Sequence, residues 1–426
     1  MDFLKELEWR GMLHDHTPGV SEILRDKGSR AYIGFDPTAP SLTIGNYVQI
    51  MLLTLFRKAG HQPIILMGGA TGLIGDPSFK DSERELKSPE ELEANLAHQS
   101  EQFHKLLGGI GEESGPMIVN NKDFYQNMNV LTFLRDVGKS LTVNYMLAKD
   151  SVKNRLDTGL SFTEFSYQLL QAYDFYHLYK NYDCKIQMGG SDQWGNITSG
   201  SEYIRRNVEG GKAYAVTSPL LTKADGSKFG KSEDGNIWLD KDLTSPYQFY
   251  QFWINADDRD LSRFIRIFSL KTRKEIQALE EEINNNPREV KKILAEEMTT
   301  RIHSKSATEA VDTVSSLLFD KKFTAERLET LNSEILQMVA MEIPNKTVNI
   351  GLLGEGISLS EMLTEHLGFF SSKSEVRRTI KGNALSINKR KVSDAEQLLD
   401  RHDLIAEKYM LIESGKKKKF MVLAGS

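Results

Sequence analysis

The first 219 residues alternate between short apolar runs and long helical patterns, and this alternation limits the possible fold more than any other feature of the sequence. The runs at 30–35, 63–67, 117–119 and 185–188 have the length and apolar content of buried strands. Each run is followed by a turn rich in Gly, Asn or Asp and then by a helical pattern. Such alternation predicts a parallel sheet of βαβ units, in which ligands bind at the carboxyl ends of the strands.

The rest of the chain differs in texture. Residues 220–321 become helical and dense in Glu, Lys and Leu, and a less patterned stretch follows them. Further on, we expect short helices at 361–366 and 374–380 and a strand at 384–388. The sequence therefore predicts an α/β chain: a Rossmann-like parallel-sheet domain at 1–219, a helical domain at 220–321, a linker at 322–350 and a small α+β domain at 351–426.

Composition excludes several functional classes. Cys184 is the only cysteine, which rules out an internal disulfide and a cysteine-rich metal site. No apolar run reaches the ~20 residues that span a bilayer, and the first residues lack the features of a signal peptide. We therefore expect a cytoplasmic protein with no membrane partner. The net charge is −5, so binding to nucleic acid would require a local cluster of basic residues.

The first polar motif covers residues 32–46, where a predicted strand leads through a turn into a helix. Thr38, Thr43 and Asn46 have side chains that donate hydrogen bonds to phosphate or ribose. Gly45 lacks a side chain where a flat ligand would approach the backbone, and amides at a helix N-terminus attract anions. An ordinary capped turn between strand and helix would use the same residue types.

Two glycine-rich turns follow other predicted strands. The turn at 68–78 contains Asp76 as its only acid, and its glycine spacing is not the G-x-G-x-x-G of dinucleotide-binding folds. Lys80 and Arg84 come next on one helix face, either as surface charges or as phosphate contacts. In the turn at 187–194, Gly190 precedes Asp192, which is suited either to cap a helix or to accept hydrogen bonds from ribose hydroxyls.

Two further motifs lie on a helix and in a loop. Within the aromatic helix predicted at 162–182, Tyr167, Gln171 and Asp174 fall within about 60° of one another. An acid buried there without a partner would be costly, so the alternative is that this face meets solvent. The loop at 223–232 holds Lys228 and Lys231 between Asp-Gly and Phe-Gly turns, although lysine loops are also common on ordinary surfaces.

The order and spacing of these five segments resemble the class I aminoacyl-tRNA synthetases, and bacterial tyrosyl-tRNA synthetases in particular. Residues 228–232 read Lys-Phe-Gly-Lys-Ser where the family has its KMSKS signature, and Thr43 and Asn46 replace the two histidines of its HIGH signature. The resemblance implies an enzyme that activates L-tyrosine with ATP, releases pyrophosphate and transfers tyrosine to the 3′-terminal adenosine of tRNA(Tyr). It also implies a homodimer with its interface at 133–162, Mg²⁺ arriving with ATP, no tightly bound cofactor and no dedicated metal site.

The resemblance also implies roles for individual residues. The catalytic, phosphate-handling residues would be Lys228, Lys231, Lys80, Arg84, Thr38 and Thr43. Tyrosine would be bound by Tyr32, Asp76, Asn121, Tyr167, Gln171, Asp174 and Gln193. ATP would be bound by Gly45, Asn46, Gly190, Asp192 and Lys231. Because Tyr32 and Asp174 would hydrogen-bond the phenolic hydroxyl, phenylalanine would leave both groups unpaired.

Residues 373–391 contain seven basic side chains and one acid, Glu375, in an otherwise acidic chain. By resemblance to the small RNA-binding domain of bacterial tyrosyl synthetases, the tRNA contacts would be Arg377, Arg378, Lys381, Lys389, Arg390 and Lys391. A solvated charged surface is the alternative for this cluster. For the whole chain, the alternatives are a tryptophanyl-type synthetase, which Tyr32 and Asp174 disfavour, and an RNA-binding protein that keeps a synthetase scaffold.

Overall fold

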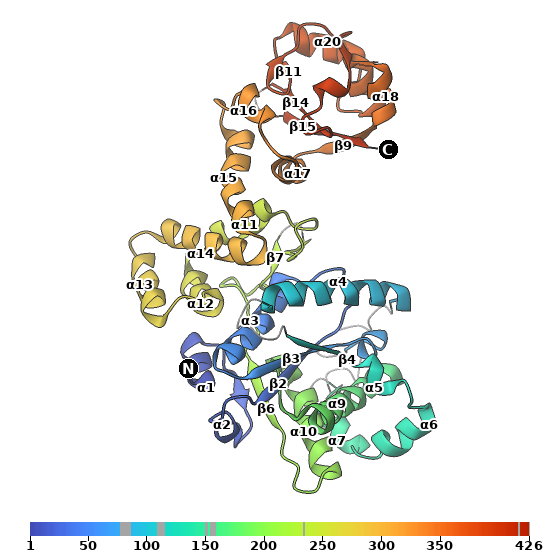
Figure 1. Cartoon of the computed structure of the whole chain (residues 1–426), viewed down its shortest axis with the longest axis vertical. Helices are drawn as coiled ribbons and strands as arrows, with labels where there is room; N and C mark the ends of the chain where they lie inside the picture. The colour runs from blue at the N-terminus through green and yellow to red at the C-terminus, as the bar shows by residue number, and fades with distance from the viewer. Residues whose placement is uncertain are drawn as a thin grey trace. The chain divides into compact units, whose positions relative to one another are not determined.

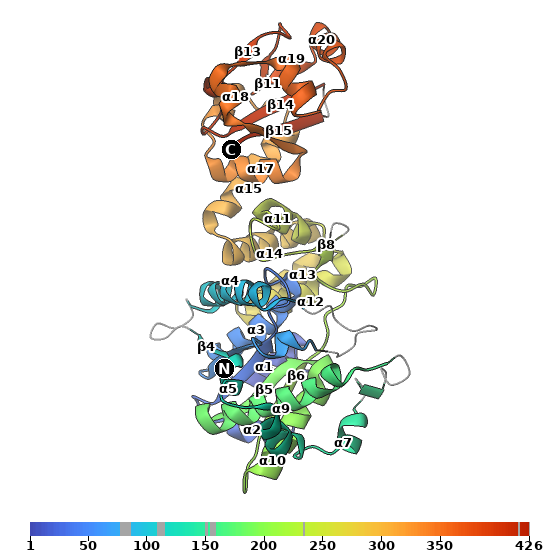
Figure 2. The ribbon, with the colours of Figure 1, turned by 90° about the vertical axis from the view of Figure 1, so that its right-hand side faces the viewer.

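The computed structural model describes residues 1–76, 87–108, 116–149, 152–153, 159–232, 235–415 and 418–425. Contacts between Cα atoms divide the chain into two compact units. The first contains residues 1–240 and 255–294, and the second contains residues 241–254 and 295–426. Figures 1 and 2 show the elements of each unit in two views. Among the residues just named, no helix combines the length and apolar character of a membrane span.

The first unit is built on a six-stranded sheet with the order β1-β6-β5-β2-β3-β4. Its strands are β1 (Asp15–His16), β2 (Arg30–Phe35), β3 (Gln62–Met67), β4 (Met117–Asn120), β5 (Cys184–Gly190) and β6 (Tyr214–Ser218). Only β1 runs antiparallel to its neighbour. The four predicted strands and the predicted parallel sheet are confirmed. The chain passes outward from β2 to β3 and β4 and then returns to β5 on the other side of β2. The strand order therefore reverses between β2 and β5, and ligands bind at this switch point in such sheets.

Helices cover both faces of this sheet (Figure 1). On one face lie α3 (Ile44–Lys58) and α4 (Pro89–Leu107), and on the other lie α9 (Phe162–Tyr182) and α10 (Trp194–Asn207). Ser88 caps α4 and Ser161 caps α9 through their side-chain oxygens, which accept from the backbone N–H three residues on. Phe175 and Leu178 of α9 pack on Tyr32, Ile64 and Leu66 of the central strands, so α9 is fixed against the sheet.

A row of amide side chains on α4 holds the turn that follows β2. Asn95, Gln99 and Gln102 lie at i, i+4 and i+7 and therefore share one helix face. Their bonds to the turn are Asn95 Nδ2 to Pro37 O (3.1 Å), Gln99 Nε2 to Ala39 O (2.7 Å) and Leu42 N to Gln102 Oε1 (2.9 Å). These bonds satisfy backbone groups of an irregular segment and position it relative to the strand ends.

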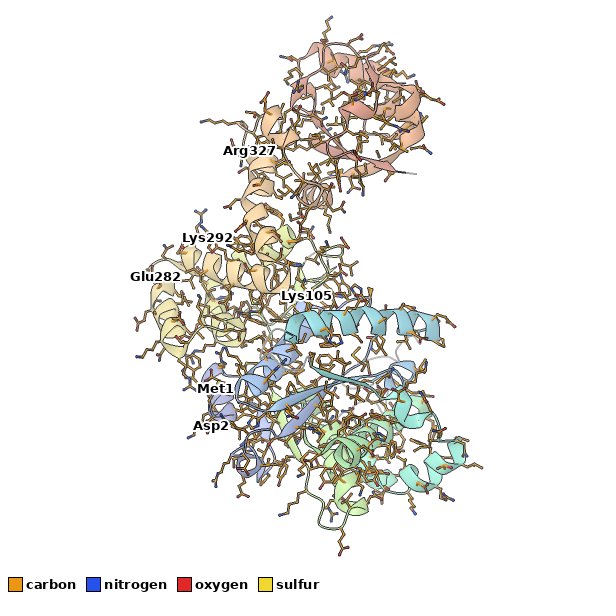
Figure 3. The ribbon with its side chains drawn as sticks, in the orientation of Figure 1. Met1, Asp2, Lys105, Glu282, Lys292 and Arg327 are labelled. Carbon is orange, nitrogen blue, oxygen red and sulfur yellow. The ribbon has the colours of Figure 1, made fainter. Side chains whose placement is uncertain are left out.

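The first unit also contains shorter elements and a helical layer. The shorter elements are α1 (Phe3–Arg10), α2 (Val20–Ile23), η1 (Thr71–Leu73), α5 (Lys122–Tyr125), α6 (Val130–Thr132), η2 (Phe133–Gly138), α7 (Val143–Leu147), η3 (Ser191–Gln193), β7 (Lys231–Ser232) and β8 (Gly235–Asn236). The helical layer consists of α12 (Asp258–Phe268), α13 (Arg273–Ile283) and the first half of α14 (Pro287–Ile302). Arg10 joins α1 to this layer, because its buried guanidinium donates to Glu6 and to the carbonyl of Ser269. Lys292 of α14 points outward (Figure 3).

The second unit begins with helices and ends in an α+β fold. Its helices are α11 (Pro246–Ile254), α15 (Lys305–Phe319), α16 (Ala325–Glu329), α17 (Ser333–Glu342), α18 (Ile350–Glu355), α19 (Leu359–Glu361), η4 (Met362–His366), α20 (Lys373–Lys381) and η5 (Arg401–Asp403). Its main sheet has the order β12-β11-β14-β15-β9, with β9 (Asn345–Asn349), β11 (Leu385–Ile387), β12 (Arg390–Lys391), β14 (Tyr409–Ser414) and β15 (Lys418–Gly425). A two-stranded sheet pairs β10 (Ile357–Ser358) with β13 (Leu398–Leu399).

Residues 322–350, which we expected to form a linker, contain α16, α17 and β9. Strand β9 pairs in parallel with β15, and its Val348 is buried in the core of the α+β fold. The segment is therefore part of the folded second unit, because a strand that completes a sheet and a core cannot act as a free connection.

Candidate active site

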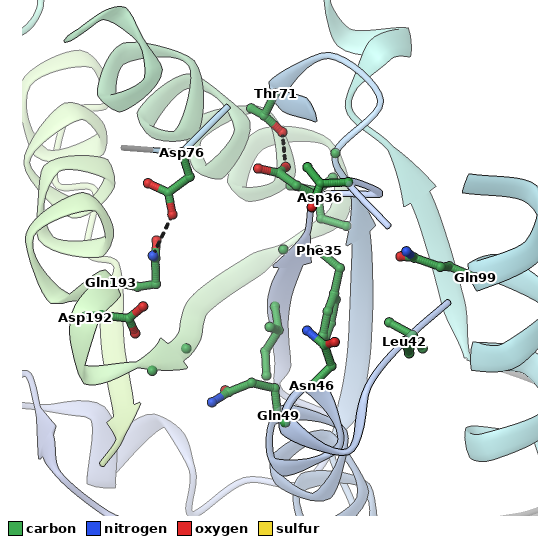
Figure 4. A pocket seen from close by; sticks show the side chains of 18 of the residues that line it. Phe35, Asp36, Leu42, Asn46, Gln49, Thr71, Asp76, Gln99, Asp192 and Gln193 are labelled. Carbon is green, nitrogen blue, oxygen red and sulfur yellow. Dashed lines mark hydrogen bonds between the residues drawn. The ribbon is translucent and has the colours of Figure 1, made fainter. Parts of the chain in front are cut away.

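A cavity of about 410 Å³ lies at the carboxyl ends of β2, β3 and β5, where the strand order predicts a ligand site (Figure 4). Its lining contains most of the residues that the sequence singled out. These are Tyr32, Thr38, Thr43, Gly45, Asn46, Asp76, Asn121, Tyr167, Gln171, Asp174, Gly190, Asp192 and Gln193. Segments that are up to 160 residues apart in the sequence therefore meet around one hollow.

The inner end of the cavity is built around a buried carboxylate on α9. Asp174 is 1% exposed. Its Oδ2 accepts from Asn121 Nδ2 at 2.9 Å, and its Oδ1 accepts from the Tyr125 hydroxyl at 2.7 Å. Burial raises the pKa of Asp174 to about 7, although both of these hydrogen bonds act in the opposite direction. The ionised form of Asp174 is thus favoured by hydrogen-bond donors and disfavoured by burial.

The hydroxyl of Tyr32 is the neighbouring polar group, and it has no hydrogen-bond partner among the described residues. Burial, followed by the charge of Asp174, raises the pKa of Tyr32 well above its usual value, so this hydroxyl keeps its proton. An unpartnered buried hydroxyl beside a buried carboxylate is costly in the empty protein. A ligand hydroxyl that accepts from Tyr32 and donates to Asp174 would satisfy both groups.

Asp36, which the sequence analysis did not single out, organises the centre of the site. Its Oδ1 accepts from the hydroxyl of Thr71 at 2.7 Å, and its Oδ2 accepts from the hydroxyl of Tyr167 at 2.9 Å (Figure 4 draws the first bond). A Cβ atom on Gly68 would lie 2.0 Å from Asp36 Oδ1, so glycine is required there. One signal pointed to Asp36: it is the first polar residue after strand β2, at the edge of the sheet where ligands bind.

A third pair of polar groups lies toward the start of α10. Gln193 Nε2 donates to Asp76 Oδ2 at 2.8 Å. Burial, followed by the nearby charge of Asp76, raises the pKa of Asp192. A Cβ atom on Gly190 would lie 2.3 Å from Asp192 Oδ1, so this glycine allows the carboxylate to turn back toward the strand end.

The electrostatic character of the cavity is strongly acidic. Asp36, Asp76, Asp174 and Asp192 all line it, and no Lys or Arg does so among its described lining residues. The buried Oε1 atoms of Gln171 and Gln187 also lack donors within the described part of the chain. Because acceptors outnumber donors in this hollow, it favours a ligand that carries a positively charged donor such as an ammonium group.

The N-terminus of α3 carries the two residues that replace the signature histidines. Asn46 Oδ1 accepts from Thr43 N at 2.9 Å and from Thr43 Oγ1 at 2.8 Å, and Asn46 N donates to Thr43 Oγ1 at 3.3 Å. This arrangement is a capping box. The hydroxyl proton of Thr43 is therefore used within the cap, whereas the Nδ2 group of Asn46 remains available as a donor.

The glycine between them is open to the cavity. A Cβ atom on Gly45 would meet nothing closer than 3.4 Å, and Gly45 has an ordinary helical conformation without a positive φ. Packing and backbone strain therefore do not require glycine at this position. The missing side chain instead enlarges the cavity, as the sequence predicted for a ligand that approaches the backbone.

The loop that carries Lys228 and Lys231 is anchored beside α3. Phe229 is buried against Phe264 and Phe268 of α12, at ring-centroid distances of 5.0 and 5.3 Å. A Cβ atom on Gly230 would lie 3.1 Å from the backbone nitrogen of Gly45. Both lysines are exposed, and neither lines the cavity. Lys80 and Arg84 lie outside the described residues.

The basic residues of the second unit have different environments. Lys389 is only 10% exposed at its side chain and pairs with Glu413 at 2.9 Å, so it is held inside the domain. Arg377 pairs with Glu396, Arg390 pairs with Glu329, and Lys391 donates to the carbonyl of Asn383. Arg378 and Lys381 of α20 are exposed and have no side-chain partner among the described residues. Lys389 is therefore not presented as a contact in the way the sequence suggested.

Comparison with known families agrees with this geometry. Residues 25–320 match the family described as tRNA synthetases class I (W and Y), and residues 334–422 match the tyrosine–tRNA ligase SYY-like C-terminal domain. The two matches together cover both structural units.

Individual relatives cover the whole chain. A tyrosine–tRNA ligase of Cytophaga hutchinsonii is 50% identical over 425 residues, which is 99% of each chain. One from Porphyromonas gingivalis is 48% identical over 430 residues, covering 99% of this chain and 100% of the relative. Among solved structures, a C-terminally truncated mitochondrial tyrosyl-tRNA synthetase of Aspergillus nidulans is 33% identical with a TM-score of 0.66, covering 75% of this chain and 94% of that one.

Burial of the Asp174 carboxylate should lower the free energy of unfolding of the ligand-free protein at high pH. Burial raises its pKa from 3.8 in the unfolded chain to about 7. The folded state therefore binds this proton more tightly, and the carboxylate destabilises the fold progressively as pH rises from about 4 to about 7. Asp174→Asn should raise the thermal midpoint of the ligand-free protein by several degrees at pH 8, and by much less at pH 5.

The amide fits because its oxygen can accept from Asn121 while Tyr125 donates to the carbonyl of Leu170, 3.0 Å away. Thermal unfolding followed by circular dichroism at the two pH values measures the effect. Asp123→Asn, at an exposed carboxylate on α5, is the control and should change neither midpoint. An Asp174→Asn protein that is no more stable than wild type at pH 8 would contradict this account.

Proposed function

The chain belongs to the class I tRNA synthetases for tyrosine and tryptophan, on the tyrosyl side of that family, and from this premise we propose how its residues perform tyrosine–tRNA ligation. The chain is an aminoacyl-tRNA ligase that joins tyrosine to tRNA. The observation that carries this conclusion is the agreement of relatives at 50% and 48% identity over at least 99% of the chain, all of them tyrosine–tRNA ligases. We further propose that the protein acts in the cytoplasm, since the relatives that match it over at least 99% of its length are bacterial.

The phenolic end of tyrosine occupies the inner end of the cavity in this proposal. Its hydroxyl accepts from the free hydroxyl of Tyr32 and donates to the carboxylate of Asp174. Two observations support this arrangement: Tyr32 has a buried hydroxyl without a partner, and Asp174 is a buried acceptor beside it. Phenylalanine would leave the Tyr32 hydroxyl unpaired and would desolvate Asp174 without adding a donor to those from Asn121 and Tyr125, so the cavity selects against it. An indole would likewise lack the hydroxyl.

The ammonium group of tyrosine binds in the acidic centre of the cavity. We assign it to Asp76, Tyr167 and Gln171, with Asn121 behind them and Gln193 near the substrate carboxylate. The unpartnered Oε1 of Gln171 supports this assignment, because it needs a donor. The acidic residues Asp36, Asp76, Asp174 and Asp192 in the cavity lining also favour a cationic ligand.

ATP binds at the N-terminus of α3 and the end of β5. Asn46 Nδ2 and Asp192 face the ribose, and Gly45 and Gly190 leave room for the nucleotide. We assign Thr43 a capping role in place of the expected contact to the γ-phosphate, because its hydroxyl proton already binds Asn46. Thr38 remains the candidate for the γ-phosphate, since it lines the cavity beside the loop held by α4.

The lysine loop supplies positive charge to the phosphates. An acidic cavity repels the triphosphate of ATP, so cations must act at its mouth. Lys228 and Lys231 flank a phenylalanine and a glycine that anchor the loop beside Gly45, and we assign them, with Lys80 and Arg84, to the pyrophosphate. Mg²⁺ is expected to arrive with ATP. Within the described residues no group of three or more His, Cys, Asp or Glu is placed to hold a metal, so its ligands would include the phosphate oxygens.

The chemistry follows from this arrangement. A carboxylate oxygen of tyrosine attacks the α-phosphorus, forming the adenylate, and the bond to pyrophosphate breaks. The terminal ribose hydroxyl of the tRNA then attacks the tyrosyl carbonyl carbon, and AMP leaves. The first step requires alignment of the two substrates and stabilisation of the charge that develops on pyrophosphate, with no covalent enzyme intermediate.

The test of the ligase assignment is amino-acid-dependent exchange of pyrophosphate into ATP, measured with all twenty amino acids. We expect stimulation by tyrosine alone. Lys231→Ala should lower the tyrosine-dependent rate by about 100-fold or more, because a charge that stabilises the transition state is lost. Lys212→Ala, at an exposed lysine before β6, is the control and should retain the wild-type rate. Stimulation by tryptophan, or an unchanged rate in Lys231→Ala, would contradict the assignment.

We further propose that the second unit binds tRNA through the exposed face of α20. Arg378 and Lys381 are the strongest candidates, because both are exposed and neither forms a side-chain hydrogen bond or ion pair within the described residues, although Glu375 lies close enough to interact with the charge of Arg378. Arg377, Arg390 and Lys391 can join them, since exposed ion pairs are weak and exchange readily for phosphate.

The double variant Arg378→Gln/Lys381→Gln should raise the KM for tRNA in the aminoacylation assay. The slope of log KM against log salt concentration should also fall, by the amount expected for the loss of about two phosphate contacts. Tyrosine-dependent pyrophosphate exchange should be unchanged, because that step does not use tRNA. Lys321→Gln/Lys322→Gln removes two adjacent exposed charges elsewhere in this unit and serves as the control. An identical salt dependence of KM in both double variants would contradict the proposed role of α20 in tRNA binding.

We also propose that the protein is a homodimer. Five large apolar side chains of the first unit are between 47% and 74% exposed, and they lie within or just before the expected interface at 133–162: Val130, Leu131, Leu134, Val143 and Phe162. Apolar groups gathered in this way usually mark a surface that another chain covers.

A charge in this patch should separate the subunits. We expect Leu131→Asp to sediment as a monomer at concentrations where the wild type is a dimer, because association would bury an unpaired carboxylate. Leu398→Asp is a matched control, since Leu398 is 69% exposed but lies in the second unit. Analytical ultracentrifugation decides the question: a wild type that is monomeric at micromolar concentration would refute the dimer.

A further inference from the structure

Tyr125, at the end of α5, is a polar residue outside the cavity lining to which neither the sequence nor the family resemblance gave a role. Its hydroxyl lies 2.7 Å from Asp174 Oδ1. Its ring packs against Tyr173 of α9 and Phe133 of η2, with centroid distances of 5.5 and 6.4 Å. Tyr125 does not line the cavity, so any effect it has on a ligand must pass through Asp174.

We propose that Tyr125 is a positioning residue for the selection of tyrosine, which fixes the Asp174 carboxylate and keeps it a hydrogen-bond acceptor for the substrate hydroxyl. This inference rests on the proposed function, because it concerns the same binding subsite. It adds a requirement beyond the contacts between the substrate and the cavity. Asp174 selects tyrosine only while Tyr125, which lies outside the cavity, donates a hydrogen bond to it.

The geometry of the carboxylate supports this role. Each oxygen of Asp174 accepts one bond from the protein, Oδ2 from Asn121 and Oδ1 from Tyr125. Two donors that approach from different elements fix the plane of the carboxylate and leave its remaining lone pairs for a ligand. Both donors are themselves held in place. Asn121 Oδ1 accepts from Ala70 N at 2.7 Å, and the ring of Tyr125 is packed among other aromatic rings.

The charges around Asp174 explain why the hydrogen bond from Tyr125 is important for its ionisation. The titratable groups that face it are Tyr32 of β2, Asp36 of the following turn, Tyr125 of α5, and Tyr167 and Tyr173 of α9. The one group among them that ordinarily carries a charge is another carboxylate, Asp36, and it disfavours the ionised form of Asp174. Hydrogen bonds from Asn121 and Tyr125 are the two influences that favour ionisation.

Loss of the Tyr125 hydroxyl therefore has a defined chemical consequence. With one of two donors removed, Asp174 retains its proton to higher pH. A protonated Asp174 carries a hydrogen of its own and is a weaker acceptor, so it binds the substrate hydroxyl less well. A neutral acid is also less costly to leave without a partner than a buried carboxylate, so phenylalanine is rejected less strongly.

The experiment is tyrosine-dependent pyrophosphate exchange by Tyr125→Phe, with the KM for tyrosine measured from pH 6 to pH 9. In the wild type, KM should rise as pH falls through about 7, where Asp174 becomes protonated. In the variant the rise should begin about one pH unit higher, so that KM is roughly fivefold above wild type at pH 7, nearly tenfold above it at pH 6, and close to it again at pH 9. The kcat at saturating tyrosine should change little, and discrimination against phenylalanine should fall.

The matched control is Tyr173→Phe, which removes a hydroxyl from the same aromatic cluster that faces Asp174 but is not one of its two described hydrogen-bond donors, Asn121 and Tyr125. It should keep the wild-type pH profile and selectivity. A KM that rises by the same factor at every pH in Tyr125→Phe, or pH profiles that coincide in the two variants, would overturn the proposal and leave Tyr125 a packing role. Absence of tyrosine-dependent exchange in the wild type would instead refute the proposed function, so the two failures are distinguishable.

Discussion

The structure of the site depends on one constraint: two carboxylates, Asp36 and Asp174, are held at the end of a parallel sheet by hydrogen-bond donors from several elements. Hydroxyls of Thr71, Tyr167 and Tyr125, together with the amide of Asn121, provide these donors. They come from the turn after β3, from α9 and from the segment after β4. The network therefore joins the elements around the cavity, and the position of each element is tied to that of the acids.

The two halves of the cavity are stabilised in different ways. The half assigned to tyrosine depends on bonds between residues distant in the sequence, and these leave Tyr32 and Gln171 unsatisfied in the empty protein. The half assigned to the nucleotide depends on local structure. It contains the capped N-terminus of α3, Gly45, where packing does not require a glycine, and the turn after β2, which is hydrogen-bonded to Gln99 and Gln102 of α4. A site that keeps unpaired groups before binding sacrifices stability for selectivity.

Sequence patterns predicted the parallel sheet and four of its six strands, because strand periodicity and glycine-rich turns are local signals. Most of the residues predicted for the site, from these patterns and from the family resemblance, line the cavity. They missed Tyr125 and the amides of α4, whose roles arise only when separate elements meet. They also suggested an exposed Lys389, whereas Glu413 on a neighbouring strand buries it. The strand in 345–349 was missed because its polar residues carry no strand pattern, and only pairing with β15 makes it one.

The capping box at the start of α3 also limits how this sequence can change. Thr43 and Asn46 each complete the other's hydrogen bonds, so replacing either one alone breaks the capping box as well as altering the nucleotide subsite. A path from this pair to the two histidines of other family members therefore passes through an intermediate that has lost the first arrangement without gaining the second. The two positions are therefore coupled through shared hydrogen bonds, and a change at one alters the effect of a change at the other.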